Sequence, residues 1–205
     1  EHPRLWSHLW DWHYGKSSNG PSGSDSPTSA EDVAEMMVAL KDDTETVALE
    51  AAYTLGEVGL PAVPRLIDTL RDGSAERWYS ADEAARHGSG IRVASAEASY
   101  ALAAVGAPAV PGLVETSRDD DLWTRVLAIE TLGDIGPPAC EAVPALVEAL
   151  NDGSEPVRQY AAEALGTTSQ STSDAVPALT EALSDEEETV RLTASLALAR
   201  IGSHA

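Results

Sequence analysis

Apolar residues recur along most of this chain in stretches long enough for a helix, and one apolar block is repeated almost unchanged. The block reads Ala-Val-Pro-x-Leu, and its four copies begin at Ala62, Ala109, Ala142 and Ala175. The last three copies are spaced 33 residues apart. A second apolar stretch follows each copy and ends near a leucine, which lies 21 residues after the proline in those three. A fixed period of this size, carried by helix-forming residues, predicts stacked helix pairs.

The pattern predicts an all-α fold, a right-handed α-solenoid of five antiparallel helix pairs. The expected pairs are about 30–41 with 45–58, 61–72 with 91–105, 108–118 with 122–135, 142–151 with 155–166, and 175–184 with 187–201. Proline suits the start of each first helix because the first N–H groups there have no intrahelical partner. Glycine adopts a left-handed cap without steric cost. We therefore expect glycines to end the second helices, at Gly59, Gly106, Gly136, Gly166 and Gly202.

The repeated residues resemble HEAT-like repeats, in particular the short repeats of phycobilisome lyases. The resemblance rests on the Ala-Val-Pro-Ala-Leu-x-x-Ala-Leu-x-Asp sequence of residues 142–152 and on the helix-forming residues 157–166. It covers about residues 30–202 and implies that the second helices line a concave surface. At the other end of the chain, residues 2–6 (His-Pro-Arg-Leu-Trp) resemble the end of some phytanoyl-CoA-dioxygenase-like enzymes.

The residues before the repeats divide into two segments. Residues 1–14 predict a short helix with Trp6, Trp10 and Trp12, which together form too much apolar surface to stay in water. We expect this helix to cap the solenoid or to belong to a missing upstream domain, since the chain begins with Glu1 rather than Met. Residues 15–28 are a flexible linker by composition, and residues 29–202 form the repeat domain.

One helix pair is longer than the others. Pro64 lies 38 residues before Leu102, whereas the same interval elsewhere is 21, and the insertion falls within residues 74–91. It concentrates basic and aromatic side chains in an acidic protein: Arg77, Trp78, Tyr79, Arg86 and His87. Insertions in repeat arrays often carry the individual function. Two interpretations stay open, a partner site beside the concave face, or an extra helix that packs Trp78 against the solenoid.

A stripe of side chains appears when the second helices are aligned on their terminal leucine. Two positions before it stand Tyr53, Tyr100, Glu130, Glu163 and Leu196, and one turn earlier stand Leu49, Ala96, Val126, Gln159 and Leu192. Residues four apart share a helix face. The stripe could face a partner, with the two tyrosines as anchors. Alternatively, the tyrosines fill space between repeats, which we consider the better supported of the two.

Three arginines, Arg125, Arg158 and Arg191, also follow the 33-residue period. Each stands near the start of a second helix, after acidic residues in the preceding turn: residues 119–121, Asp152 and Asp185. They could form a basic stripe that binds an anion. We favour the other interpretation, a ladder of Asp–Arg pairs that joins adjacent repeats and sets their stacking register.

Composition narrows the partners. The formal net charge of −21 opposes binding to nucleic acid or to an anionic membrane and favours cationic partners. The single Cys140 excludes an internal disulfide and is expected to be a small apolar filler between helices. No signal peptide or membrane span is visible, so we expect a cytoplasmic protein. We expect no metal and no cofactor, because His8 and His13 are five residues apart and share no helix face.

The sequence favours a non-catalytic function. Deoxyhypusine hydroxylases have a similar fold but depend on repeated His-Glu pairs, and this chain has no His-Glu dipeptide. Neither a Ser/His/Asp order nor a glycine-rich phosphate loop is present. We therefore expect a protein-interaction scaffold that binds a protein partner along its concave face. The alternatives are an accessory domain of a larger enzyme or a bilin-lyase-like protein.

Overall fold

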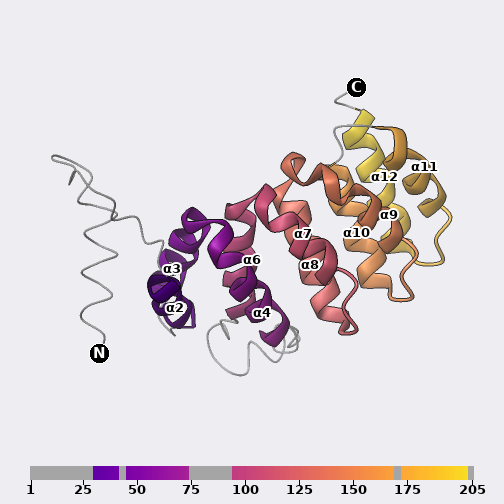
Figure 1. The fold of residues 1–205 in the computed structure, drawn as a ribbon. Coiled ribbons are helices and arrows are strands. Elements are labelled where there is room, and N and C mark those ends of the chain that lie inside the picture. The colour runs from indigo at the N-terminus through magenta and orange to yellow at the C-terminus, as the bar shows by residue number, and fades with distance from the viewer. Residues whose placement is uncertain (1–29, 42–44, 74–93, 169–171, 203–205) are drawn as a thin grey trace.

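The protein is an all-helical solenoid over the residues that the structure, a computed structural model, describes: 30–41, 45–73, 94–168 and 172–202. The first three pairs are α2 (Ala30–Ala39) with α3 (Glu45–Val58), α4 (Val63–Gly73) with α6 (Ala94–Val105), and α7 (Val110–Thr116) with α8 (Leu122–Ile135). The last two are α9 (Val143–Ala149) with α10 (Glu155–Thr168), and α11 (Thr172–Ala182) with α12 (Glu188–Gly202). These pairs stack side by side in a curved array (Figure 1). The predicted fold class is confirmed.

Glycine separates the first three pairs from the pairs that follow them. Gly59, Gly106 and Gly136 have φ values of 73°, 73° and 68°, and ψ near −135° to −139°. This region of φ and ψ is open almost only to glycine, but it is not the left-handed helical cap that the sequence predicted. In each case the glycine N–H donates to the carbonyl of the terminal leucine of the second helix, Leu55, Leu102 or Leu132.

The first helices start at proline in three pairs. A short 3₁₀ turn leads into α4, α7 and α9, with Pro64, Pro111 and Pro144 in the first helical turn. The fifth pair departs from this rule, because α11 begins at Thr172 and contains Pro177 within the helix. The expectation that a Val-Pro start opens the fifth pair is therefore wrong.

The core follows the array from end to end and is built from leucine and alanine. The terminal leucines Leu55, Leu102, Leu132 and Leu165 are fully buried. Four residues before each of them, and before Leu198, stands a fully buried alanine: Ala51, Ala98, Ala128, Ala161 and Ala194. Since each pair buries its apolar faces against its neighbours, the core forms only when the pairs stack.

The second helices approach one another closely. A Cβ added at Gly56 would lie 2.6 Å from Cβ of Ala104, and one added at Gly166 would lie 3.0 Å from Cα and Cβ of Ala197. Gly166 therefore does not end its helix, as the sequence predicted, but lies inside α10, which continues to Thr168. Small residues at these positions permit the close spacing of the second helices.

Some expectations fall on residues outside those described. They concern the aromatic-rich residues 1–14, the linker of residues 15–28 and the insertion of residues 74–91. Within the described residues, no helix is long and apolar enough to span a bilayer.

Candidate protein-interaction surface

One face of the second helices is accessible along the whole array, and we call it the second-helix surface. It comprises the positions six and two residues before the terminal leucine of α3, α6, α8, α10 and α12, and the position two residues after it. All of these side chains are at least partly exposed, except one. The exception is Val126, which is fully buried in the core. Its expected place on the stripe is a wrong prediction, because α8 also buries the neighbouring Leu127 and Ile129 and presents few side chains to solvent.

Two tyrosines dominate the N-terminal half of this surface. Tyr53 on α3 and Tyr100 on α6 are 44% and 56% exposed, and Leu49 lies one turn before Tyr53. α3 and α6 pack directly against each other. The expectation that the tyrosines merely fill space between repeats is therefore wrong, since both residues keep about half of their accessible surface.

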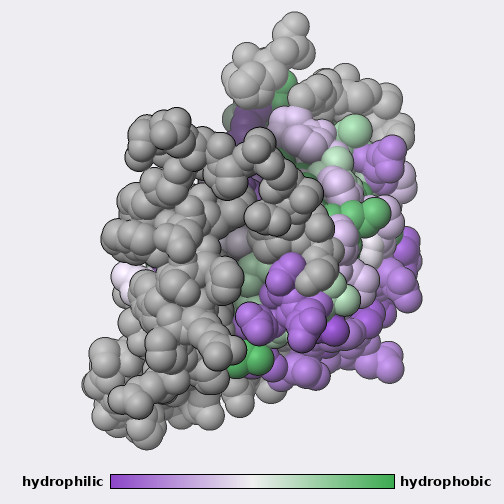
Figure 2. Space-filling model, turned by 60° about the vertical axis from the view of Figure 1, so that its left-hand side comes forward, coloured by the Kyte–Doolittle hydropathy of each residue, from purple (hydrophilic) through white to green (hydrophobic). Residues whose placement is uncertain are grey.

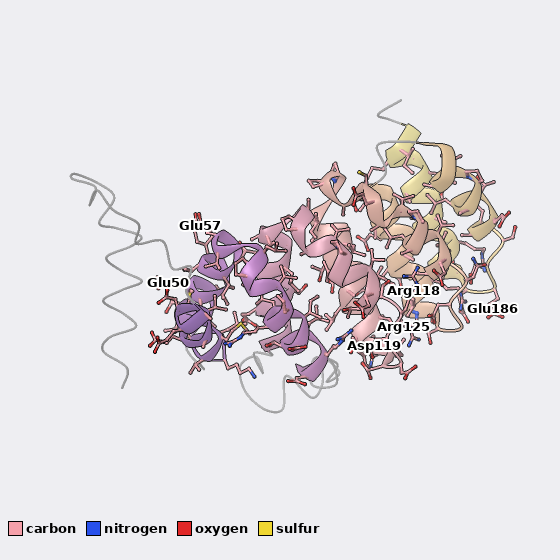
Figure 3. The ribbon with its side chains drawn as sticks, viewed as in Figure 1. Glu50, Glu57, Arg118, Asp119, Arg125 and Glu186 are labelled. Carbon is pink, nitrogen blue, oxygen red and sulfur yellow. The ribbon has the colours of Figure 1, made fainter. Side chains whose placement is uncertain are left out.

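Acidic side chains occupy the middle of the second-helix surface. Glu130 is partly buried on α8, whereas Asp134 on α8 and Glu163 on α10 are exposed. Glu57 adds a further carboxylate at the end of α3 (Figure 3). Among the positions that define the surface, the one cation is Arg200 at the end of α12. The view toward the α2–α3 end shows a described surface that is mostly hydrophilic, with small scattered apolar areas (Figure 2). The second-helix surface thus combines the aromatic side chains of its N-terminal half with the negatively charged side chains of its middle.

The turns within the pairs lie on a different edge of the molecule and share one construction. Asp119, Asp152 and Asp185 each accept the backbone N–H of the residue two positions later, at 2.8–3.0 Å. The arginine six residues after each aspartate donates Nη1 to that aspartate's backbone carbonyl, at 2.9, 3.1 and 2.7 Å for Arg125, Arg158 and Arg191. Each arginine is thus anchored to its own turn.

The same arginines join successive repeats. Arg125 donates Nε and Nη2 to the carboxylate of Asp152 at 3.0 and 3.2 Å, and Arg158 donates the same two groups to Asp185 at 2.8 and 3.0 Å. The guanidinium groups are therefore engaged within the protein and are not a basic stripe for an anion. The Asp–Arg ladder that the sequence favoured is confirmed at these two junctions. Bidentate pairs of this kind fix the geometry of both partners.

The ladder is most buried at Arg158, where both side chains are about nine-tenths inaccessible. The hydrogen bonds from Arg158 hold the pKa of the Asp185 carboxyl below its ordinary value, and a backbone N–H bond from Glu187 acts in the same direction. Asp185 in turn raises the pKa of Arg158. Burial opposes both shifts because it disfavours the charged forms. The pair is therefore ionised at neutral pH.

Two further arginines link repeats at more exposed points. Arg118 donates to Glu148 at 2.6 Å, and this hydrogen bond lowers the pKa of Glu148 and raises that of Arg118. Arg71, at the end of α4, contacts Asp119 at 3.2 Å. Figure 3 shows Arg118, Asp119, Arg125 and Glu186 along the same edge of the array. The sequence analysis considered only the arginines of the second helices and did not predict the link from Arg71, which stands seven residues after Pro64 as Arg118 stands after Pro111.

The remaining expected site residues divide between exposed and undescribed positions. Cys140 is exposed in the 3₁₀ turn of residues 137–142, so its expected role as an apolar filler is wrong. The insertion residues of the expected binding site lie outside the described residues: Arg77, Trp78, Tyr79, Arg86 and His87. Tyr53, Tyr100 and Glu163 are exposed and Glu130 is partly buried, at equivalent positions of four second helices, and their role in binding stays a prediction.

Comparison with known proteins agrees with this architecture. Residues 143–205 match the family model for HEAT repeats, so the last two helix pairs carry the pattern most clearly. The chain is a HEAT-like repeat protein. No curated protein matches the sequence.

Solved structures with a similar fold cover most of this HEAT-like chain. One belongs to the complex of CpcE and CpcF of phycocyanin lyase from Nostoc sp. PCC7120, with 20% identity and a TM-score of 0.56, over 82% of this chain and 99% of that one. Another is the designed armadillo repeat protein YIII(Dq.V1)4CPAF in complex with peptide (KR)4, with 19% identity and a TM-score of 0.50, over 86% and 88% of the two chains. At these identities the likeness concerns the fold alone.

Proposed function

We propose that this protein is a non-catalytic interaction module that binds an extended segment of a partner protein along the second-helix surface. The observation that carries the proposal is the exposure of Tyr53 and Tyr100 on two adjacent helices of that surface. Tyrosine is enriched among residues that dominate binding energy, because its ring buries much area and its hydroxyl tolerates water. Two such rings on neighbouring repeats suit a ligand that crosses several helices.

The acidic middle of the surface defines the chemistry of the ligand. Glu130, Asp134 and Glu163 follow the tyrosines along the array, so a segment that runs over both regions needs apolar and basic residues. Acidic residues outnumber basic ones by 34 to 13 in the chain, and the resulting field attracts cations and repels anions. The proposed ligand is therefore a basic, partly apolar peptide segment.

The fold is compatible with such a ligand. The designed armadillo protein of similar fold was solved with the peptide (KR)4, which is a strongly basic segment. That binding belongs to the designed protein. It supports the proposal only in showing that an array of this kind can hold an extended basic chain.

The insertion remains a proposed part of the same site. Arg77, Trp78 and Tyr79 stand in the sequence between α4 and α6, and α6 carries Tyr100. Replacing the insertion with the short turn of residues 152–156 is expected to preserve folding, because that turn already joins a helix pair. Loss of peptide binding in the shortened protein would support a role for the insertion, and misfolding would assign it to packing.

A binding titration tests the proposal. Fluorescence anisotropy would follow a labelled peptide of alternating lysine and leucine, with alternating glutamate and leucine as the charge-reversed control. We expect Tyr53→Ala with Tyr100→Ala to weaken lysine–leucine binding at least tenfold, and Glu163→Lys to weaken it further at low salt. Matched controls are Val38→Ala and Glu181→Lys, which change an exposed apolar and an exposed acidic residue on first helices. Equal losses in the control variants would contradict the proposal.

A bilin-lyase-like function is the second candidate, because the similar chain from the phycocyanin lyase complex is covered over 99% of its length. A bilin carries propionates that require basic partners, and Arg200 is the one cation among the positions that define the second-helix surface. A titration with a free bilin, followed by its visible absorbance, distinguishes the two functions. A saturable spectral shift that survives Tyr53→Ala would favour the lyase-like function.

A further inference from the structure

A cavity of about 340 Å³ lies between the first helices of the first two pairs. The end of α2, the turn after it and α4 line this cavity with Met37, Val38, Lys41, Arg65, Asp68 and Thr69. α2 packs against the 3₁₀ turn Leu60–Ala62 more than against α4 itself, which leaves this space between the two helices. Small-molecule sites in proteins have volumes of roughly 300–1,000 Å³, so the cavity is large enough for a small ligand.

Arg65 departs from the repeat at the position that faces this cavity. It is the variable residue of the Ala-Val-Pro-x-Leu block, and the other three copies have Gly112, Ala145 and Ala178 there. A Cβ added at Gly112 would lie 3.5 Å from Ile67 of α4, so this position faces the first helix of the preceding pair. Arg65 faces α2 in the same way. Since the other pairs stack with glycine or alanine at this position, the fold does not require a long cation there.

The two cations of the cavity differ from the other described cations. The other arginines interact with carboxylates, carbonyls or other groups of the protein: Arg71, Arg118, Arg125, Arg158, Arg191 and Arg200. The side chains of Lys41 and Arg65 make no hydrogen bond or ion pair within the described part of the chain, and both are exposed at the same cavity. Two unpaired positive charges on facing elements favour an anion between them.

Thr69 adds a buried hydroxyl to the cavity. Thr69 is only 5% exposed, and its hydroxyl has no hydrogen-bond partner among the described residues. Thr116 stands at the same distance from its proline and donates its hydroxyl to the Gly112 carbonyl at 2.8 Å. A buried hydroxyl without a partner is costly, and an acceptor atom of a ligand in the cavity would satisfy it. The hydroxyl therefore favours a ligand with an oxygen acceptor.

We propose that this cavity binds a small organic acid with one carboxylate and an apolar body. The carboxylate would lie between Lys41 and Arg65, and the apolar body would cover the side chains of Met37 and Val38. Thr69 would donate its hydroxyl to the carboxylate. Asp68 lines the same cavity, so two cations and one anion leave a single net positive charge. This balance suits a ligand with one negative charge and disfavours a dicarboxylate or a phosphate.

The acidity of the chain is compatible with a local site for an anion. The formal net charge is −21, but salt screens exposed charges beyond about 8 Å at physiological ionic strength. The two cations at the cavity act within that distance on a ligand that contacts them. The cavity site goes beyond the proposed peptide function, because its described lining residues lie on first helices and in the turn after α2. Tyr53→Ala with Tyr100→Ala should therefore leave binding in the cavity unchanged.

The methionines of the chain supply a direct readout. The sequence contains two, Met36 in the core and Met37 at the cavity, so the methyl spectrum of ¹³C-methionine protein has two signals, which Met37→Leu assigns. The full chain would be titrated with 4-methylpentanoate. We expect a saturable shift of the Met37 signal and a smaller one of the Met36 signal. The neutral 4-methylpentanamide and the doubly charged 3-methylpentanedioate should each bind at least tenfold more weakly.

Substitutions in the cavity separate binding from folding. Arg65→Ala introduces the small residue of the other repeats and should keep the helical circular dichroism, while weakening 4-methylpentanoate binding at least tenfold. Lys41→Ala should weaken it similarly, whereas Arg65→Lys keeps the charge and should cost less. Asp68→Asn should strengthen binding of 3-methylpentanedioate more than that of 4-methylpentanoate. Arg118→Ala, which removes an exposed cation elsewhere on a first-helix edge, is the matched control and should change nothing.

Three results would overturn the proposal. They are a Met37 signal that does not shift with 4-methylpentanoate, equal affinity for the amide, and full affinity in Arg65→Ala and Lys41→Ala. A carboxylate at the end of a peptide offers the same chemistry from another source. An acetylated Gly-Gly-Leu peptide with a free carboxyl group that bound tenfold more tightly than 4-methylpentanoate would overturn the choice of a small ligand.

Discussion

Two junctions of the array present an aspartate at the same point of the repeat, but a different cation binds each aspartate. One junction joins the fourth and fifth helix pairs, and the other joins the second and third pairs. At the later junction Asp185 receives a buried bidentate pair from Arg158, from the expected position in α10. At the earlier junction that position in α6 is occupied by the buried Ser95. Asp119 is met instead by Arg71 from the end of α4, with 39% and 26% of the two side chains exposed.

The earlier junction adds a contact that the later one lacks. The hydroxyls of Ser99 on α6 and Thr131 on α8 lie 2.6 Å apart and are buried. A buried hydroxyl pair satisfies both groups but carries no charge, so it costs less desolvation than an ion pair. The comparison shows that stacking of the helices does not require one particular polar link. The links differ in how far they remove charge from water, and this difference sets the expected size of each mutational effect.

The largest expected effect is that of Arg158→Ala. It leaves the Asp185 carboxylate largely buried without its bidentate partner, and we expect a loss of about 3 kcal/mol of unfolding free energy. Arg191→Ala is the matched control, because Arg191 has the same anchoring bonds but no ion pair within the described residues, and should cost under about 1 kcal/mol. Urea unfolding followed by circular dichroism measures both. Equal losses would mean that the anchoring bonds, and not the ladder pair, stabilise the junction.

A steric change at the later junction should have a somewhat smaller effect. In Gly166→Val, the new Cβ would start 3.0 Å from Ala197 and two methyl groups would follow, so we expect a loss of about 2 kcal/mol from overpacking. Gly112→Ala is the control, because its Cβ would meet Ile67 at an ordinary 3.5 Å. The alanine should be neutral or stabilise the helix by up to about 1 kcal/mol. Destabilisation by Gly112→Ala of the same size would contradict this account of close approach.

The pH dependence of the later junction follows from the lowered pKa of Asp185. Folding favours the ionised carboxylate, so its contribution to stability is present above about pH 4 and is lost as pH falls toward the lowered pKa. The difference in unfolding free energy between the wild type and Asp185→Asn should therefore be largest near neutral pH and shrink below pH 4. In the Arg158→Ala background this pH dependence should shrink, because the largest cause of the lowered pKa is removed while the backbone N–H bond from Glu187 remains. A difference that grew on acidification would refute the assignment.

The smallest effects are expected at the exposed links. Arg71→Ala removes a partly exposed pair and should cost under about 1 kcal/mol, with a further decrease in high salt. Arg118→Ala, where both side chains are more than half exposed, should give no resolvable shift of the thermal midpoint. If Arg71→Ala proved as costly as Arg158→Ala, exposure would not explain the difference between the junctions.

Much of the site could be predicted from the sequence, because its features follow the repeat. The shared surface of Tyr53 and Tyr100 follows from their equal distance to the terminal leucine, and the Asp–Arg pairs follow from the 33-residue spacing. Features that depend on contacts between irregular positions could not be predicted in this way. Arg71 meets an aspartate 48 residues later, across the insertion that breaks the 33-residue spacing, and Val126 turns into the core although its equivalents are at least partly exposed.

The sequence by itself determined the architecture, since a repeated apolar pattern with proline at the start of helices permits little besides stacked helix pairs. It also determined which arginine stands opposite which aspartate, because both recur with one period. Tertiary structure decided how far each of these contacts is buried, and hence how much it contributes to the stability of the fold. Gly166 became a close-packing residue inside α10 because α12 approaches it, and Arg158 became a buried cation because a repeat follows it. Arg191 has the same local sequence setting, but within the described residues no repeat packs against it, and it is only partly buried.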